Sequence, residues 1–343
     1  MQQRIEFIDL AKGICIILVV LLHIVPSANI PELRFIRIPL YFILSGLFFK
    51  DYGSFRNFLK KKVNNILIPF LFFYVVSYLI YYIIRLFVPN LYIANASGIL
   101  DVFTQRNLFN GPLWFLLCLF WTNAYFCIIS LIFNKERYRA IIVLIIGVLG
   151  AILLERNVFL PMYLDVAMRA LPIFYIGFIL KHTPILYPNA YDRYNLLFAV
   201  ILFAITGLMF LYTHPSVPFE STTWEGGILG YIISTAGVLS LFMICKMIKH
   251  IPYVSYFGRY SIIVLCTHHL IYRPILLCLS NLLTNYVLVT WCTFGMTLVV
   301  TYYLIPLCIK YIPYVTAQKN IFQLKSILSS TYKCNFLGAD NKQ

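Results

Sequence analysis

Long apolar runs are the feature that most constrains how this chain can fold. A helix that crosses a bilayer needs about 20 mostly apolar residues, and helices are one of the few structures that satisfy every backbone hydrogen bond in lipid. We identify ten such runs, at residues 8–27, 36–50, 65–88, 113–133, 139–155, 168–181, 194–213, 227–248, 260–282 and 285–312. The second and sixth runs are short. The pattern predicts an all-α polytopic membrane protein with about ten transmembrane helices.

Composition supports this class. Apolar residues make up 61% of the chain and charged residues 11%, whereas a soluble domain is about half apolar and a quarter charged. The net charge of +15 might suit nucleic acid, but the Lys and Arg residues lie mostly in the short gaps between apolar runs. No basic helix with interleaved aromatic residues is present, so we exclude nucleic acid as a partner.

The gaps between the runs alternate in charge, which predicts an orientation. One set of gaps is rich in Lys and Arg, whereas the loop THPSVPFESTTWEGG has neither. The positive-inside rule then places both termini in the cytoplasm, and an even number of spans agrees with termini on the same side. The first run lacks a basic segment before it and a cleavage site after it, so we expect it to be retained as a span. Residues 1–313 form the predicted membrane domain, and 314–343 a polar cytoplasmic tail.

The cysteines and histidines show no metal-ligand spacing. Nine cysteines are present, mostly within apolar runs, and no CxxC or Cys/His pattern occurs. We interpret the cysteines as small packing residues of helices, and we expect neither disulfides nor a metal site.

The first apolar run carries three ionisable residues, Asp9, Lys12 and His23. His23 lies eleven positions after Lys12, which corresponds to three helical turns plus about 20° and a rise of roughly 16.5 Å. Asp9 lies three residues before Lys12, within pairing distance, so all three share one stripe. Such groups are costly in lipid unless they are paired or face a cavity. We expect the stripe to line a path from the cytoplasm to His23, whose neutral imidazole can accept a proton; the alternative is a snorkelling lysine with an interfacial histidine.

Two further groups of polar residues stand near the ends of apolar runs. Arg37 precedes the stretch IPLYFILSG, in which Ser45 is followed by glycine. Asp165 and Arg169 are four residues apart, a spacing that suits an intrahelical ion pair.

The ninth run contains His268, His269 and Arg273. His269 and Arg273 are four residues apart and share a helix face. We therefore expect one histidine of this pair to hold Arg273 while the other points elsewhere.

Six motifs in order resemble those of a known family. They are IDLAKGICIILVVLLH, IPLYFILSGLFF, KKKVNNILIPF, GPLWFLLCLF, LDVAMRALPIFYIGFIL and GRYSIIVLCTHHLI. The first resembles the initial helix of the acyltransferase family 3 membrane proteins, and the third resembles their basic loop leading into the third helix. The nearest subset is the stand-alone sugar O-acetyltransferases of the fucose 4-O-acetylase type. The chain departs from many relatives in having Lys12 in place of Arg, and Arg37 where sugar-modifying relatives often have His.

The resemblance implies transfer of an acyl group, usually acetyl, from cytoplasmic acyl-CoA to a hydroxyl of a cell-surface or lipid-linked glycan, in a bacterial inner membrane. No cofactor is expected beyond acetyl-CoA as co-substrate. His23 would act as general base or, alternatively, as a nucleophile that takes the acyl group. The remaining expected site residues are Asp9 and His268 in catalysis, Lys12, Lys60, Lys61 and Lys62 on the CoA phosphates, and Arg37, Ser45, Trp114 and Asp165 on the acceptor or oxyanion.

Two other function classes compete with the enzyme. An exporter of polysaccharide or a small metabolite would also bury charges within the membrane. The lack of internal repeats and of paired broken helices disfavours it. A membrane scaffold or receptor would leave the stripe on the first helix unexplained.

Overall fold

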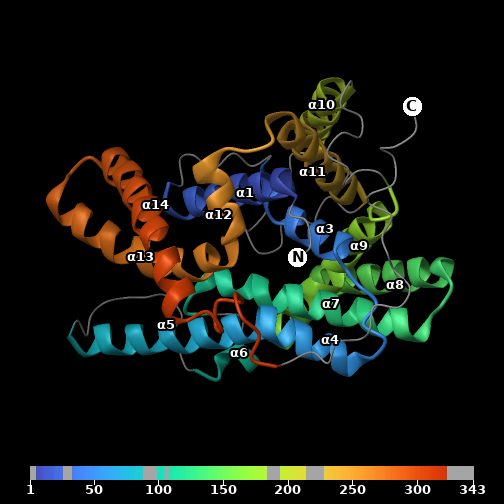
Figure 1. The fold of residues 1–343 in the computed structure, drawn as a ribbon, viewed down its shortest axis with the longest axis horizontal. Helices are drawn as coiled ribbons and strands as arrows, with labels where there is room; N and C mark the ends of the chain where they lie inside the picture. Colours follow the sequence, from blue (N-terminus) through green and yellow to red (C-terminus); the bar gives the residue numbers. More distant parts are fainter. Residues whose placement is uncertain are drawn as a thin grey trace, which may run out of the picture.

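The structure, a computed structural model, describes residues 5–25, 33–87, 99–104, 108–183, 194–213 and 228–322, and within these ranges the regular elements are all helices (Figure 1). The α-helices are α1 (Glu6–Ile24), α2 (Arg34–Arg37), α3 (Pro39–Leu47), α4 (Phe55–Lys62), α5 (Ile68–Phe87), α6 (Asp101–Thr104), α7 (Trp114–Ile132), α8 (Glu136–Glu155), α9 (Leu164–Leu180), α10 (Asn195–Thr213), α11 (Ile228–Ile248), α12 (Pro252–Arg259), α13 (Ser261–Leu282) and α14 (Tyr286–Tyr311).

All ten apolar runs form helices, so the prediction of an all-α polytopic membrane protein is confirmed. Among the described residues, eight helices are long and apolar enough to cross a membrane, and two shorter apolar ones, Phe35–Leu47 and Asn195–Leu208, accompany them. The sixth run is longer than expected, because its helical segment begins at Pro161 and includes the charged turn before the apolar residues. The orientation of the termini stays a prediction, and the loop at 213–227, which has no Lys or Arg, lies almost wholly outside the described residues.

The basic run at Lys60–Lys62 is helical, which corrects the expected loop. Ser54 caps α4 by accepting a hydrogen bond from the Asn57 amide at 3.3 Å. Lysine is a good helix former, and its charge is favourable in the last turn of a helix. A π-helical turn, Val63–Leu67, then joins α4 to α5 without a break.

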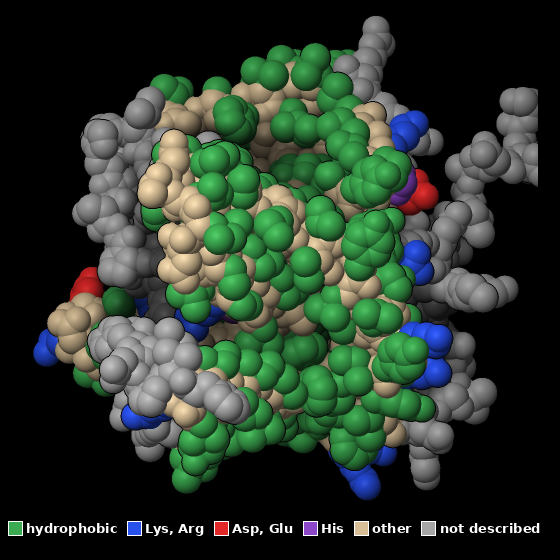
Figure 2. All heavy atoms as spheres, turned by 90° about the vertical axis from the view of Figure 1, so that its left-hand side faces the viewer, with side chains coloured by type: hydrophobic (Ala, Val, Ile, Leu, Met, Phe, Trp, Pro, Cys, Tyr) green, Lys and Arg blue, Asp and Glu red, His purple; other side chains and the backbone are tan. Residues whose placement is uncertain are grey.

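The helices at one end of the molecule have the surface expected in lipid. Val287 and Val299 of α14 are both 57% exposed, and Figure 2 shows the face at this end as largely hydrophobic. The opposite side of α14 carries the buried residues Thr293, Thr297 and Thr301, each of which donates to a carbonyl four residues earlier at 2.7 Å. The hydroxyls of these three threonines are thus satisfied within the helix and turned away from lipid.

The first residues of the predicted polar tail lie on the membrane domain. Asn64, in the π-helical turn, donates to the carbonyl of Phe322 at 2.9 Å and accepts from the amides of Ile321 and Phe322 at 3.0 Å. The eight cysteines of the described ranges form no disulfide, as expected. Cys334 lies outside those ranges.

Two helix pairs that surround the site approach closely at glycines. Gly13 of α1 faces Gly258 of α12, and a Cβ on either one would collide with backbone of the facing helix. In the same way Gly46 of α3 and Gly177 of α9 sit against the carbonyls of Phe174 and Ile43. Small residues allow such close packing of membrane helices, where no hydrophobic driving force between helices exists. Figure 1 shows α1 beside α12 and α3 beside α9, and both pairs are in contact.

We expect Gly177→Ala to destabilise the protein, because the new methyl group meets backbone that cannot move independently of α3. Overpacking of this kind typically costs about 1–3 kcal/mol. Gly295→Ala in α14 is the matched control, since a Cβ there meets nothing within 4 Å and alanine improves helix propensity by up to about 1 kcal/mol. Thermal unfolding of the purified protein in detergent measures both. Equal midpoints for the two variants would contradict the close approach of α3 and α9.

Candidate functional site

The polar stripe of α1 exists as predicted. The ammonium of Lys12 lies 3.0 Å from an Asp9 carboxylate oxygen, and the two side chains are only 24% and 12% exposed. The Tyr41 hydroxyl donates to the carbonyl of Lys12 at 3.0 Å and ties α3 to the same turn. The stripe therefore begins with an ion pair that satisfies the lysine near one end of the span.

A cavity of about 170 Å³ lies along the same face of α1. Ile16, Val19 and His23 line it from α1, following Lys12 at helical spacing. The face of α1 between Lys12 and His23 thus borders a cavity at Ile16 and Val19, and the path from the cytoplasm to His23 stays a prediction. The other walls come from α2 and α3, the π-helical turn, the start of α7, and α13. The polar and aromatic lining residues are His23, Arg37, Tyr41, Asn65, Trp114, Phe115 and Ser261.

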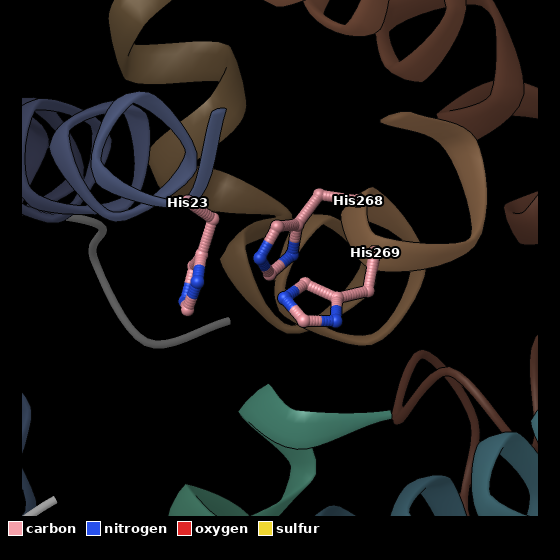
Figure 3. Close-up of side chains that lie close together, drawn as sticks. All are labelled: His23, His268 and His269. Atoms are coloured by element: carbon pink, nitrogen blue, oxygen red, sulfur yellow. The ribbon is translucent and has the colours of Figure 1, made fainter. Parts of the chain in front are cut away.

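Three histidines meet at one end of this cavity. The ring centroid of His23 lies 5.4 Å from that of His268 and 4.7 Å from that of His269, which are 5.1 Å from each other. Figure 3 shows His23 projecting from the end of α1 toward the two rings of α13. No hydrogen bond joins His269 to Arg273 among the described residues, and both histidines face His23. The expected division of roles between them is therefore wrong.

The hydrogen bonding of His268 defines its tautomer. Its Nδ1 lies 2.8 Å from the carbonyl oxygen of Val264, and His268 is fully buried. A carbonyl only accepts, so Nδ1 carries the proton and Nε2 of the neutral ring is left as an acceptor. Within the described residues, neither this Nε2 nor either nitrogen of His269 has a hydrogen-bond partner. The acceptor nitrogen Nε2 of His268 therefore makes no hydrogen bond to the described part of its own helix, and its ring lies beside those of His23 and His269.

The structure also brings two of the predicted substrate-contacting residues to His23. Arg37 is 3% exposed, donates to the carbonyl of Leu18 on α1 at 3.3 Å, and lines the cavity. Trp114 begins α7 and lines the opposite wall, with its ring 5.8 Å from that of Tyr163. A guanidinium and an indole thus border the same space as the histidine, from three different helices.

Two other predicted residues are held away from the cavity lining. The Ser45 hydroxyl lies 3.1 Å from Oδ1 and 2.9 Å from Nδ2 of Asn123, so it joins α3 to α7. Asp165 is fully buried, pairs with Arg169 at 3.4 Å, and accepts from the amide of Leu160 at 3.3 Å. The predicted Asp165–Arg169 ion pair is confirmed, and it stabilises the first turn of α9.

The lysines of α4 do not line the cavity, but they lie on the helix that leads to it. Lys60, Lys61 and Lys62 are half-buried at the end of α4, and Asn65 in the following π-helical turn contributes to the wall. π-helical turns are rare and often occur at functional sites. Sequence reasoning missed Asn65, together with Tyr41 and Ser261, because each lies within or next to a motif read for its other residues.

A polytopic helix bundle with a half-buried histidine lining a mainly apolar cavity is an arrangement that suits a membrane-embedded enzyme. The chain matches the model of an acyltransferase domain over residues 5–306, and it belongs to acyltransferase family 3, as its motifs indicated. It is a multi-pass membrane acyltransferase, which moves an acyl group from a donor to an acceptor. No curated protein and no solved structure matches the chain.

The contact of Ser45 with Asn123 predicts energetic coupling between α3 and α7. Side-chain hydrogen bonds between membrane helices contribute about 0.6 kcal/mol on average in double-mutant cycles. We expect a coupling of this size from the unfolding free energies of Ser45→Ala, Asn123→Ala and the double variant. Additive effects of the two substitutions, together with a raised KM for the acceptor in Ser45→Ala, would instead favour a direct contact of Ser45 with substrate.

Proposed function

We propose that this acyltransferase moves an acetyl group from acetyl-CoA to a hydroxyl of a cell-surface or lipid-linked glycan. The donor would enter from the cytoplasmic side of a bacterial inner membrane, with both termini on that side. The observation that supports the proposal is the cavity along the face of α1 that carries Lys12 and His23, because His23, the candidate general base, is one of its lining residues. The rise of roughly 16.5 Å between these residues suits the reach of the pantetheine arm of CoA.

The donor site would use positive charge at the outer end of the stripe. Lys12 keeps 24% of its side chain exposed while it pairs with Asp9, so its ammonium can also meet a phosphate. Lysine binds phosphate as a point charge, without the bidentate geometry of arginine. Lys60, Lys61 and Lys62 would add to the local positive potential. Asp9 would hold Lys12 in place.

His23 would act on the acceptor as a general base. It takes the proton of the acceptor hydroxyl, whose oxygen attacks the thioester carbonyl. The tetrahedral intermediate then expels CoA as a thiolate, and the thiolate takes the proton from His23. This sequence returns the imidazole to its neutral form. It requires only the neutral histidine at the start.

Arg37 and Ser261 are the cavity groups suited to the developing oxyanion. Both line the cavity with His23, and preorganised donors at the position of developing charge usually give the largest catalytic effect. His268 would serve differently. The proton on its Nδ1 is bonded to Val264, so its Nε2 accepts rather than donates and would orient the ring of His23. Trp114 would contact the acceptor.

Replacing the base tests the central step. In membranes with matched expression, we expect His23→Ala to lower transfer of labelled acetyl from acetyl-CoA to host glycan by about 10²–10⁴-fold. Equal activity in wild type and His23→Ala would refute the proposal. An acyl group trapped on His23 by rapid quenching would overturn direct transfer in favour of the covalent route.

Replacing the outer lysine tests the donor site separately. We expect Lys12→Gln to raise the KM for acetyl-CoA, with a smaller change in kcat, because a phosphate contact is present throughout the reaction. Lys135→Gln is the matched control, since Lys135 is an exposed lysine next to α8. The wild-type KM should also rise with salt, and this rise should be weaker in Lys12→Gln. A kcat effect with unchanged KM would remove Lys12 from the donor site.

A further inference from the structure

The three histidines at the end of the cavity have the arrangement of a ligand set. His23 from α1 and the adjacent His268 and His269 from α13 present imidazole nitrogens that all lie within 4.8 Å of one another. Figure 3 shows the three rings directed toward a common region between the two helices. This cluster could not be predicted from the sequence, because His23 is far from the other two histidines in the chain. The expectation that the chain has no group of possible metal ligands is therefore wrong.

Burial and hydrogen bonding distinguish this cluster from histidines that are simply packed. His268 is fully buried and His269 is 6% exposed, and in the described part of the chain three of their four ring nitrogens have no hydrogen-bond partner. A buried polar group left without a partner costs about 1–3 kcal/mol. Both side chains face His23. Such groups point to a species bound between the rings.

The hydrogen bond from His268 to Val264 is the kind that supports metal ligation. Histidines that bind metals almost always donate their second ring N–H to a carbonyl or carboxylate, which fixes the tautomer and the orientation of the ring. The Nδ1–H of His268 makes this bond at 2.8 Å, so the lone pair of Nε2 is presented to the cluster. α13 therefore already supplies the hydrogen bond that a metal-binding histidine makes through its second ring nitrogen.

The ligand chemistry narrows the choice of ion. The set consists of three imidazoles without a carboxylate or thiolate. Imidazole suits zinc, copper, nickel and iron rather than calcium or magnesium. Three protein ligands with one further position open to water or another ligand are typical of catalytic zinc sites rather than of closed structural sites. Because His23 also lines the cavity, the open position would face the cavity.

We propose that His23, His268 and His269 bind a divalent transition-metal ion of the zinc class, and that the bound ion inhibits acyl transfer. Zinc–nitrogen bonds of about 2.0–2.1 Å bring tetrahedral ligand atoms to roughly 3.4 Å from one another. The rings must therefore close together by about 1 Å relative to the metal-free arrangement. The positive charge of Arg37, which lines the same cavity, repels a divalent cation. An anion at the fourth coordination position offsets this repulsion.

Inhibition follows from competition for one imidazole, and this part rests on the proposed function of His23. A general base needs a nitrogen lone pair that is directed at the acceptor. A metal ion held by His23 uses a lone pair of the same ring and fixes the ring toward α13. Metal binding and proton transfer by His23 are then mutually exclusive.

Metal binding is tested first, without activity. The full chain, purified in detergent with a tag that contains no histidine, is titrated with Co²⁺, and visible absorption of tetrahedral cobalt is followed. We expect one Co²⁺ per chain, displaced by Zn²⁺. His268→Ala and His269→Ala should weaken binding by about 100-fold, at the upper end of the loss seen for outer-shell partners.

The exposed histidines supply the control. His182→Ala and His250→Ala replace exposed residues and should bind Co²⁺ as the wild type does. Absence of the absorption band in the wild type would overturn the metal site. Persistence of the band in His268→Ala and His269→Ala, with loss in His182→Ala or His250→Ala, would also overturn it. Far-ultraviolet circular dichroism of each variant separates loss of a ligand from loss of fold.

Inhibition is tested with the acetyl-transfer assay of the preceding section. We expect Zn²⁺ to abolish transfer in the wild type and a chelator to restore it, whereas Mg²⁺ has no effect. In His269→Ala, the activity that remains should need about 100-fold more Zn²⁺ for the same inhibition. Stimulation by Zn²⁺, or full activity at saturating Zn²⁺, would overturn the inhibitory role. If metal-free protein binds Co²⁺ but transfers no acetyl group, the metal site stands and the proposed function fails.

Discussion

The close approach of α1 to α12 is the contact on which the rest of the site depends. Gly13 and Gly258 let the two backbones meet, and no side chain fits between them. This contact fixes the rotation of α1 about its own axis. The rotation in turn decides that the stripe from Lys12 to His23 faces the interior and that the opposite side of the helix packs in the core. A different rotation would turn an ion pair and an imidazole toward lipid, at a cost of several kcal/mol.

Buried polar groups in this protein are of two kinds. Some are satisfied by a neighbour at short range, such as the Asp165–Arg169 ion pair and the contact of Ser45 with Asn123. These connect turns or helices, and they hold the frame of α3, α7 and α9. Others border an open space, as His23 does, and their environment leaves room for a substrate or an ion. The two kinds differ in what they border, a neighbouring side chain or an open cavity, rather than in residue type.

The helices and part of the site could be predicted from the sequence. The rest of the site could not, and the reason is physical. Apolar runs and helical spacing are local, so the ten helices, the Asp9–Lys12 pair and the Asp165–Arg169 pair followed from residues a few positions apart. The motifs also predicted the family. Contacts between distant helices are not local. The meeting of His23 with His269, and the removal of Ser45 from the cavity by Asn123, depend on how α1, α3, α7 and α13 cross.

The π-helical turn shows how a short segment can join the far end of the chain to the site. Asn64 and Asn65 are adjacent, yet Asn64 is buried against the backbone of residues 321–322, and Asn65 lines the cavity. A π-helical turn contains one residue more than an α-helical turn would need, and the extra residue rotates the chain that follows it. The three hydrogen bonds of Asn64 hold this wider turn in place, because its side chain has no other orientation that satisfies both its oxygen and its nitrogen. The position of Asn65 in the cavity wall is therefore linked to the segment that follows α14.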